Sequence, residues 1–268
     1  MEIRSFAEGV LTATSLAKKL EPPPPDLSDA EPGDGLAPEG PVRPPGLEIR
    51  AGRAVRVPPA SGLADPAQRS RILHAFVNHE LQAAELFSWA LLRFPKSPPA
   101  FRRGLLRLVA DEQSHARLYC ERLEELGVSF GDLPVSGHFW RQRPLFGTAL
   151  KFVVRMGLVF ESANLDLGLE HLAVAEHCGD LETSRILKIV HRDEVQHVAF
   201  AWTWFRAFKD QSQNDWDAYS EALGDPAVAA RARGKLFDRK GRLRAGVAPE
   251  FLARLEAIAP RTPGGHAR

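Results

Sequence analysis

The feature that most constrains this chain is the motif Glu-x-x-His, which occurs twice, each time directly after an Asp. A single Glu precedes each copy by about one helical hairpin, 32 residues before the first motif and 33 before the second. Helical bundles bind two metal ions with one Glu from each of two helices and a Glu-x-x-His from each of the other two. The pattern predicts a di-metal site with these ligands: Glu80, Glu112, His115, Glu161, Glu194 and His197.

Each predicted ligand lies in the middle of an apolar row of its helix, because positions three and four residues apart share a helical face. Val77 and Ala84 flank Glu80, and Val190 and Ala201 flank the second motif. Burying an unpaired carboxylate costs several kcal/mol, so four of them need compensating charge. Two divalent cations would supply it. The alternative is that these are ordinary Glu and His residues on solvated helix faces.

Four long helical stretches are expected at 66–94, 98–127, 146–178 and 180–210, separated by Pro and Gly. The first and second stretches, and the third and fourth, are joined by few residues and must be antiparallel neighbours. About 20 residues join the second to the third, enough to cross a bundle lengthwise. The sequence therefore predicts an all-α, ferritin-like four-helix bundle with one long crossover, at residues 66–211.

Two flanking regions are expected outside the bundle. Residues 1–65 combine a short helix at 5–20 with a Pro-rich segment, since 12 of the 21 prolines lie between positions 21 and 68. That segment should be extended, either as a disordered linker or as a layer over the bundle. Residues 212–268 form a basic tail packed on the bundle, with a short helix at 249–258.

The net charge and the cysteine count of the whole chain exclude several classes of protein. A net charge of +1 gives no general reason to expect nucleic-acid or membrane binding. Two cysteines are too few for a disulfide framework or a four-Cys iron site. No export signal or apolar stretch of membrane-spanning length is visible, so we expect a cytoplasmic protein without a membrane partner.

Several neighbours of the ligands are further candidates. Asp111 and Asp193 are predicted to accept a hydrogen bond from the distal imidazole nitrogen of the His on a facing helix, or else to be solvated helix charges. Glu85 is the alternative to Glu80 as a ligand, and whether it joins the site is left open; the two cannot bind alike, because five residues turn a helix by about 140°. His191 lies three residues before Glu194 and could approach the site.

Tyr119 follows His115 by four residues. This spacing resembles that of ribonucleotide reductase small subunits, and the resemblance implies a radical tyrosine at this offset. Tyr119 is the candidate catalytic residue, with Cys120 and Trp204 as neighbours, although an inward aromatic side chain is more often core packing. Gly157 and Gly168 leave space that would admit a substrate or permit close helix packing. The basic run at 231–244 could dock RNA, a nucleotide or an acyl carrier, or simply be solvated.

These residues resemble the ferritin-like superfamily of di-iron and iron–manganese carboxylate proteins, including rubrerythrins, ribonucleotide reductase small subunits and a di-iron tRNA hydroxylase. The strings 79–86 and 160–166, with both Asp-Glu-x-x-His motifs, are most similar to a bacterial ferritin-like family of unknown function. The resemblance implies the fold and two iron ions, with a manganese–iron pair as the alternative. It leaves the reaction open.

Rubrerythrins carry an extra ligand Glu and usually a four-Cys domain, which this chain lacks. The symmetric set of four Glu and two His implies O2 activation to oxidise or hydroxylate an organic substrate, either a small molecule or one carried on tRNA or an acyl carrier. Electrons would come from a separate donor or from the substrate, and a homodimer is compatible with the family. The alternatives are a metal-handling or peroxide-detoxifying protein, and a non-enzymatic bundle that has kept the motif.

Overall fold

The computed structural model describes residues 1–49 and 55–260. Within these residues the regular elements are all helices and no strand forms, which confirms the predicted all-α class. Parts of the predicted Pro-rich segment (50–54) and basic tail (261–268) lie outside the described residues. The chain divides into two compact units, Met1–Pro144 and Leu145–Arg268, called here the N-terminal and C-terminal units. The three-part division expected from the sequence stays a prediction.

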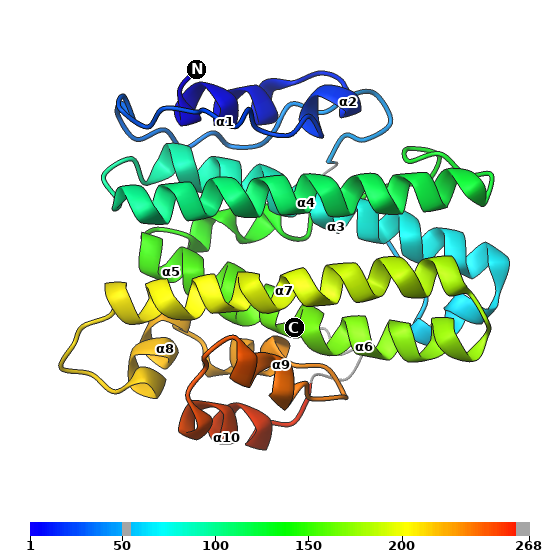
Figure 1. Ribbon diagram of the computed structural model, residues 1–268. Helices are drawn as coiled ribbons and strands as arrows, with labels where there is room; N and C mark the ends of the chain where they lie inside the picture. The colour runs from blue at the N-terminus through cyan, green and yellow to red at the C-terminus, as the bar shows by residue number, and fades with distance from the viewer. Residues whose placement is uncertain (50–54, 261–268) are drawn as a thin grey trace. The chain divides into compact units, whose positions relative to one another are not determined.

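The N-terminal unit is built on a hairpin of two long helices, α3 (Pro66–Arg93) and α4 (Pro99–Glu125), within two residues of their predicted bounds. The side chain of Asp65 accepts a hydrogen bond from the Gln68 N–H and caps α3. After α4, Gly127 adopts a φ of 74°, a left-handed conformation that ends the helix. The short connection between α3 and α4 makes them antiparallel neighbours, as Figure 1 shows.

The N-terminal segment forms two short helices, α1 (Ile3–Thr12) and α2 (Leu16–Lys19), where the sequence analysis expected one helix at 5–20. The break occurs because the side chain of Ser15 accepts a hydrogen bond from the Lys18 N–H and starts a new helix. Helix α1 packs against α3 (Figure 1).

The described part of the Pro-rich segment lies on the α3–α4 hairpin, and a short 3-10 helix (Ala60–Ala64) leads into α3. Backbone hydrogen bonds join Val42 to Leu11 and Leu36 to Leu92. Asp29 forms a bidentate ion pair with Arg102, whose side chain is almost fully buried. After α4 the chain runs irregularly to a second 3-10 helix, Trp140–Leu145.

The C-terminal unit contains a second helical hairpin. Its first arm comprises α5 (Ala149–Val153), a π-helix (Val154–Glu161) and α6 (Ser162–His177), and its second arm is α7 (Leu181–Phe208). These bounds agree with the stretches predicted at 146–178 and 180–210, but the π-helix was not predicted. Gly179, with a φ of 73°, separates the arms, and Asp180 caps α7 through the Thr183 N–H.

The π-helix packs directly on α7. A Cβ atom at Gly157 would lie 2.1 Å from the Cβ of Ala201, too close for any real contact. Gly157 therefore permits close helix packing, the second of the two roles considered for it. A Cβ at Gly168 would meet nothing closer than an ordinary contact with His191 at 3.9 Å.

Four short helices complete the part of the C-terminal unit that the structure describes, and the sequence analysis expected only the last of them. They are α8 (Asp215–Leu223), a 3-10 helix (Pro226–Ala232), α9 (Arg239–Arg244) and α10 (Pro249–Ala257). Aromatic rings tie α7, α8 and α10 together, since Phe251 contacts Trp202, Trp216 and Tyr219 at 5.0–5.2 Å between centroids.

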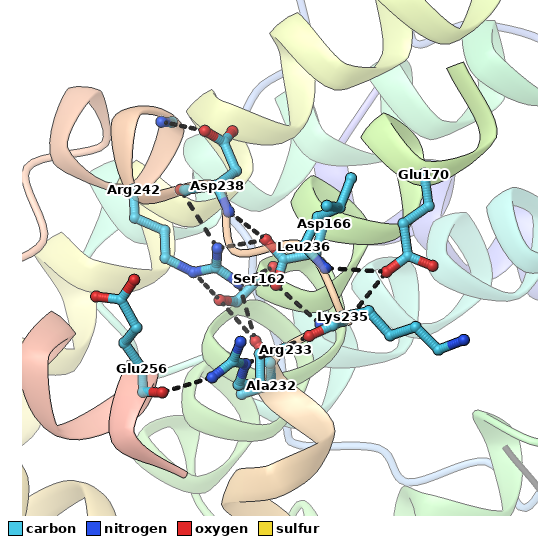
Figure 2. A network of polar contacts seen from close by, with 12 residues as sticks. Ser162, Asp166, Glu170, Ala232, Arg233, Lys235, Leu236, Asp238, Arg242 and Glu256 are labelled. Atoms are coloured by element: carbon cyan, nitrogen blue, oxygen red, sulfur yellow. Dashed lines mark hydrogen bonds and ion pairs between the residues drawn. The ribbon is translucent and has the colours of Figure 1, made fainter. Parts of the chain in front are cut away.

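A buried ion pair fixes the basic tail to α6 (Figure 2). Arg242, fully buried, binds both carboxylate oxygens of Asp166 at 2.6 and 2.9 Å. It also donates to the Ser162 carbonyl and the Ala232 carbonyl. Asp166 in turn accepts the backbone N–H groups of Gly234 and Asp238. Part of the basic run is therefore structural. Among the described residues, no helix is long and apolar enough to cross a bilayer.

Candidate metal centre

The N-terminal unit brings three of the predicted ligands together on facing sides of α3 and α4. Glu80 comes from α3, and Glu112 and His115 come from α4. Each offers a ligand atom within 4.8 Å of the others, and all three are buried. His115 Nδ1 lies 3.8 Å from Glu80 Oε2 and 3.7 Å from Glu112 Oε2. We call this group the N-terminal triad.

The carboxyl of Glu80 is in an environment that opposes its charge. Burial raises its pKa well above the usual value, and the neighbouring Glu112 carboxylate raises it further, while His115 acts in the opposite direction. Among the described residues no Lys or Arg pairs with Glu80. A bound cation would reverse this preference and hold both carboxylates ionised.

The C-terminal unit contains a matching group, the C-terminal triad. Glu161 ends the π-helix, and Glu194 and His197 come from α7. Their ligand atoms also lie within 4.8 Å of one another, and His197 Nδ1 is 3.5 Å from Glu194 Oε2. All three residues are at most 2% exposed.

Asn164 is a member of this site that the sequence analysis did not identify. Its amide nitrogen donates to Glu161 Oε2 at 3.1 Å and to Glu194 Oε1 at 3.3 Å. It thereby holds the two carboxylates of the C-terminal triad in one orientation. Its position three residues after Glu161, on the same helical face, was the available signal.

The donor set fits a metal ion. Carboxylate oxygen and imidazole nitrogen bind divalent metals at about 2.0–2.2 Å, which separates neighbouring ligand atoms by about 3.0–3.5 Å. The distances of 3.5–3.8 Å in both triads are close to this spacing. In the described chain, Glu194 Oε2 is buried without a hydrogen-bond donor. These buried Glu and His groups could hold a metal ion.

Glu85, the alternative to Glu80, is used differently. It is fully buried and forms ion pairs with Lys19 at 3.0 Å and Arg43 at 2.6 Å. The indole N–H of Trp140 donates to its Oε2 at 3.0 Å. Its charge is already balanced, so Glu80 is the carboxylate of α3 that remains suited to a metal.

His191 is directed toward Asp238, with 2.9 Å between Nε2 and Oδ2. Burial opposes ionisation of Asp238, but hydrogen bonds from His191 and the Gly241 N–H hold its pKa below the usual value. This contact ties α7 to the basic tail and accounts for His191 without a metal.

Asp111 and Asp193 are both partly buried. Arg192 contacts both carboxylate oxygens of its neighbour Asp193, at 2.9 and 3.2 Å. The predicted hydrogen bonds from these aspartates to the imidazoles of facing helices stay predictions.

Tyr119 lies one helical turn after His115 and is 2% exposed, with its ring 5.3 Å from that of Phe76. Burial raises the pKa of the adjacent Cys120 to about 12, so this thiol is not a thiolate at neutral pH. Trp204 packs between Phe200 and Phe208 on α7. Tyr119 is thus a core aromatic residue, whereas Trp204 is only partly buried, and a catalytic role for Tyr119 stays a prediction.

The fold and these groups define an all-helical protein with buried clusters of Glu and His that could bind metal. Residues 7–253 match the family described as "Protein of unknown function (DUF455)", and the chain belongs to that family. It is also 28% identical over 162 residues to an uncharacterized protein of Haemophilus influenzae, a match covering 56% of each chain. The chain thus spans about half the length of that relative. No solved structure matches the chain.

Proposed function

We propose that the two triads together bind two metal ions, both of them iron, and that the protein uses O2 to oxidise or hydroxylate an organic substrate. The observation that carries the proposal is the contrast between buried carboxylates. In the part of the chain that the structure describes, Glu85 and Asp166 are neutralised by Lys or Arg, whereas Glu80 and Glu194 have no such partner.

The pairing of the triads is inferred from the sequence. Each offers two carboxylates and one imidazole, at nearly equal spacing along its hairpin. Four carboxylates balance the +4 charge of two divalent ions, and the imidazoles complete the ligand sets. A manganese–iron pair has the same ligand requirements.

In this proposal the residues of the two triads bind the metal ions, and their neighbours orient the ligand side chains. Asn164 fixes the carboxylates of the C-terminal triad, and burial keeps bulk water from both groups. When bound, a pair of redox-active ions would supply the electron transfer to O2 that the side chains cannot. The further electrons that the reduction of O2 requires come from a separate donor protein or from the substrate. The chain has no electron-donating four-Cys iron site of its own, because its two cysteines are too few to form one.

The test is metal content and O2 consumption of ferrous-loaded protein, measured on the wild type, Glu112→Gln, Glu194→Gln and Glu121→Gln. We expect about two ions per chain and metal-dependent O2 uptake in the wild type. Both are expected to fall sharply in the first two variants. Glu121 is an exposed residue of α4, and its variant is the matched control.

Failure to bind stoichiometric metal would reject the proposal. Continued uptake of many iron ions per chain, or peroxide turnover as the main activity, would favour the metal-handling alternative instead.

A further inference from the structure

The N-terminal unit contains a cavity of about 430 Å³ beside α3. One face of α3, the segment 55–57 and the segment 133–136 form its walls. Sites for small molecules in proteins are typically about 300–1,000 Å³. The cavity is thus large enough for a small organic ligand.

The charged groups of the cavity are basic. Arg56 and Arg71 line it, and none of its described lining residues is an Asp or a Glu. Among the described residues neither guanidinium forms an ion pair, and the Arg71 guanidinium donates one hydrogen bond, to the Arg56 carbonyl at 3.3 Å. Asp132 is the nearby acid whose charge raises the pKa of the cavity residue His74, and one of its carboxylate oxygens accepts the Ser129 N–H. Two guanidinium groups are therefore available to an anion.

His74 adds a neutral hydrogen-bond donor to the wall. It is 2% exposed, and its Nε2 accepts the backbone N–H of Gly131 at 3.0 Å. Burial lowers the pKa of His74 to about 4, with Asp132 opposing the shift, so the ring is neutral at pH 7. With Nε2 accepting, the ring proton lies on Nδ1. That group donates to no residue in the described ranges.

The other lining groups are apolar or already engaged: the ring of His79 packs against Phe76 and Phe139, and the Ser136 hydroxyl accepts the His138 N–H. Apolar side chains of both segments and of α3 line the cavity beside the two arginines: Val55, Val57, Ala75, Leu133, Pro134 and Val135. The amide of Asn78 is occupied, since it accepts from Arg43 and donates to the Ser136 carbonyl. The cavity thus combines cationic donors with an apolar wall.

We propose that this cavity binds a small organic anion, a carboxylate or phosphate monoester attached to an apolar body. Arg56 and Arg71 hold the charged group, His74 Nδ1 donates to it, and the valines contact the apolar part. None of the residues of the N-terminal triad lines the cavity, and on α3 Glu80 lies about 200° around the helix from Asn78 and about 100° from His79. The inference does not depend on the proposed metal chemistry.

The test uses metal-free full-length protein and four probes: phenyl phosphate, benzoate, inorganic phosphate and benzyl alcohol. Calorimetry measures affinity, and the ¹⁵N resonances of His74 report whether the probe reaches the cavity. We expect saturable binding of at least one organic anion, with benzyl alcohol and inorganic phosphate at least about tenfold weaker. The stronger of phenyl phosphate and benzoate identifies the anionic group.

Arg71→Gln is expected to weaken binding about tenfold. Arg71 is exposed, so this variant should fold, and thermal melting checks that it does. Arg107→Gln, at an exposed position of α4, is the matched control and should bind like the wild type. Equal binding by Arg71→Gln, no saturable organic anion at millimolar concentration, or inorganic phosphate binding as tightly as both organic anions would overturn the proposal.

Discussion

The two units carry the same arrangement of acidic residues on hairpins that differ in geometry. In each, a Glu on the first arm is followed five residues later by a second buried carboxylate: Glu80 by Glu85, and Glu161 by Asp166. The first arm of the N-terminal unit is a continuous α-helix, whereas the corresponding arm of the C-terminal unit contains a π-helix that ends at Glu161. π-helical turns occur frequently at functional sites.

The second carboxylate of each pair attaches a segment from outside the hairpin. Glu85 is held by Lys19 and Arg43 of the N-terminal segment, and Asp166 by Arg242 of the tail. Buried carboxylates five residues apart thus have opposite surroundings, one paired with cationic side chains and one grouped with Glu and His. The comparison teaches that burial alone does not distinguish a candidate metal ligand from an anchoring carboxylate, whereas the partner of the carboxylate does.

The largest expected effect is at Arg242. Arg242→Ala leaves Asp166 buried without its cation and should destabilise the C-terminal unit by about 3–5 kcal/mol. Chemical denaturation measures this loss. Arg244→Ala, two residues later and exposed, should change stability by less than about 0.5 kcal/mol. Similar small losses in both variants would show that the buried pair does not anchor the tail.

Glu85→Gln and Glu80→Gln test the contrast within α3. Glu85→Gln leaves Lys19 and Arg43 without a counter-charge and should cost metal-free protein about 3 kcal/mol or more. Glu80→Gln should change the stability of metal-free protein by less than about 1 kcal/mol, because an amide resembles the protonated carboxyl that a raised pKa favours. If Glu80→Gln lowered the melting temperature of metal-free protein more than Glu85→Gln does, the basis for choosing Glu80 as the ligand would be removed.

His74 should make the N-terminal unit sensitive to acid. Its pKa falls from 6.5 to about 4 on folding, so between these values the unfolded chain binds more protons than the folded chain. Stability should therefore rise with pH from about 4 to 6.5, by up to about 3 kcal/mol, and be unaffected by this group above that range. His74→Gln should flatten the dependence. If the stability of the variant depended on pH as that of the wild type does, His74 would not be the group responsible.

Gly157→Ala tests the close packing of the π-helix on α7, and its expected loss of stability is the smallest of the four. The added methyl would overlap Ala201 and should destabilise the C-terminal unit by about 1–3 kcal/mol. Gly168→Ala is the matched control, and it should be neutral or stabilising by up to about 1 kcal/mol because α6 has room there. Equal melting temperatures for both variants would show that close packing at Gly157 is not required.

The four long helical stretches were predictable because local signals end them. Prolines start α3 and α4, and Gly127 and Gly179 follow the helices they terminate. The short helices were harder to predict. Helices α8 and α9 depend on capping by Asn214 and Asp238, and a run of nine or fewer residues shows little periodicity.

The grouping of the candidate ligands within each hairpin was also predictable, since Glu-x-x-His fixes two of them on one face and the hairpin length sets the third. The role of Glu85 was not. Its partners Lys19 and Arg43 lie 66 and 42 residues away, in the N-terminal helical stretch and in the Pro-rich segment, so no local signal reports the pairing.

The sequence by itself determined the helices, the hairpins and the two sets of three candidate ligands, because these depend on spacings of a few residues and on Pro, Gly and capping side chains. Only the tertiary structure decided which buried carboxylates are neutralised by cationic residues, where the first arm becomes a π-helix, and that a basic cavity lies beside α3. These features depend on contacts between segments far apart in the chain, where packing and desolvation outweigh local preference.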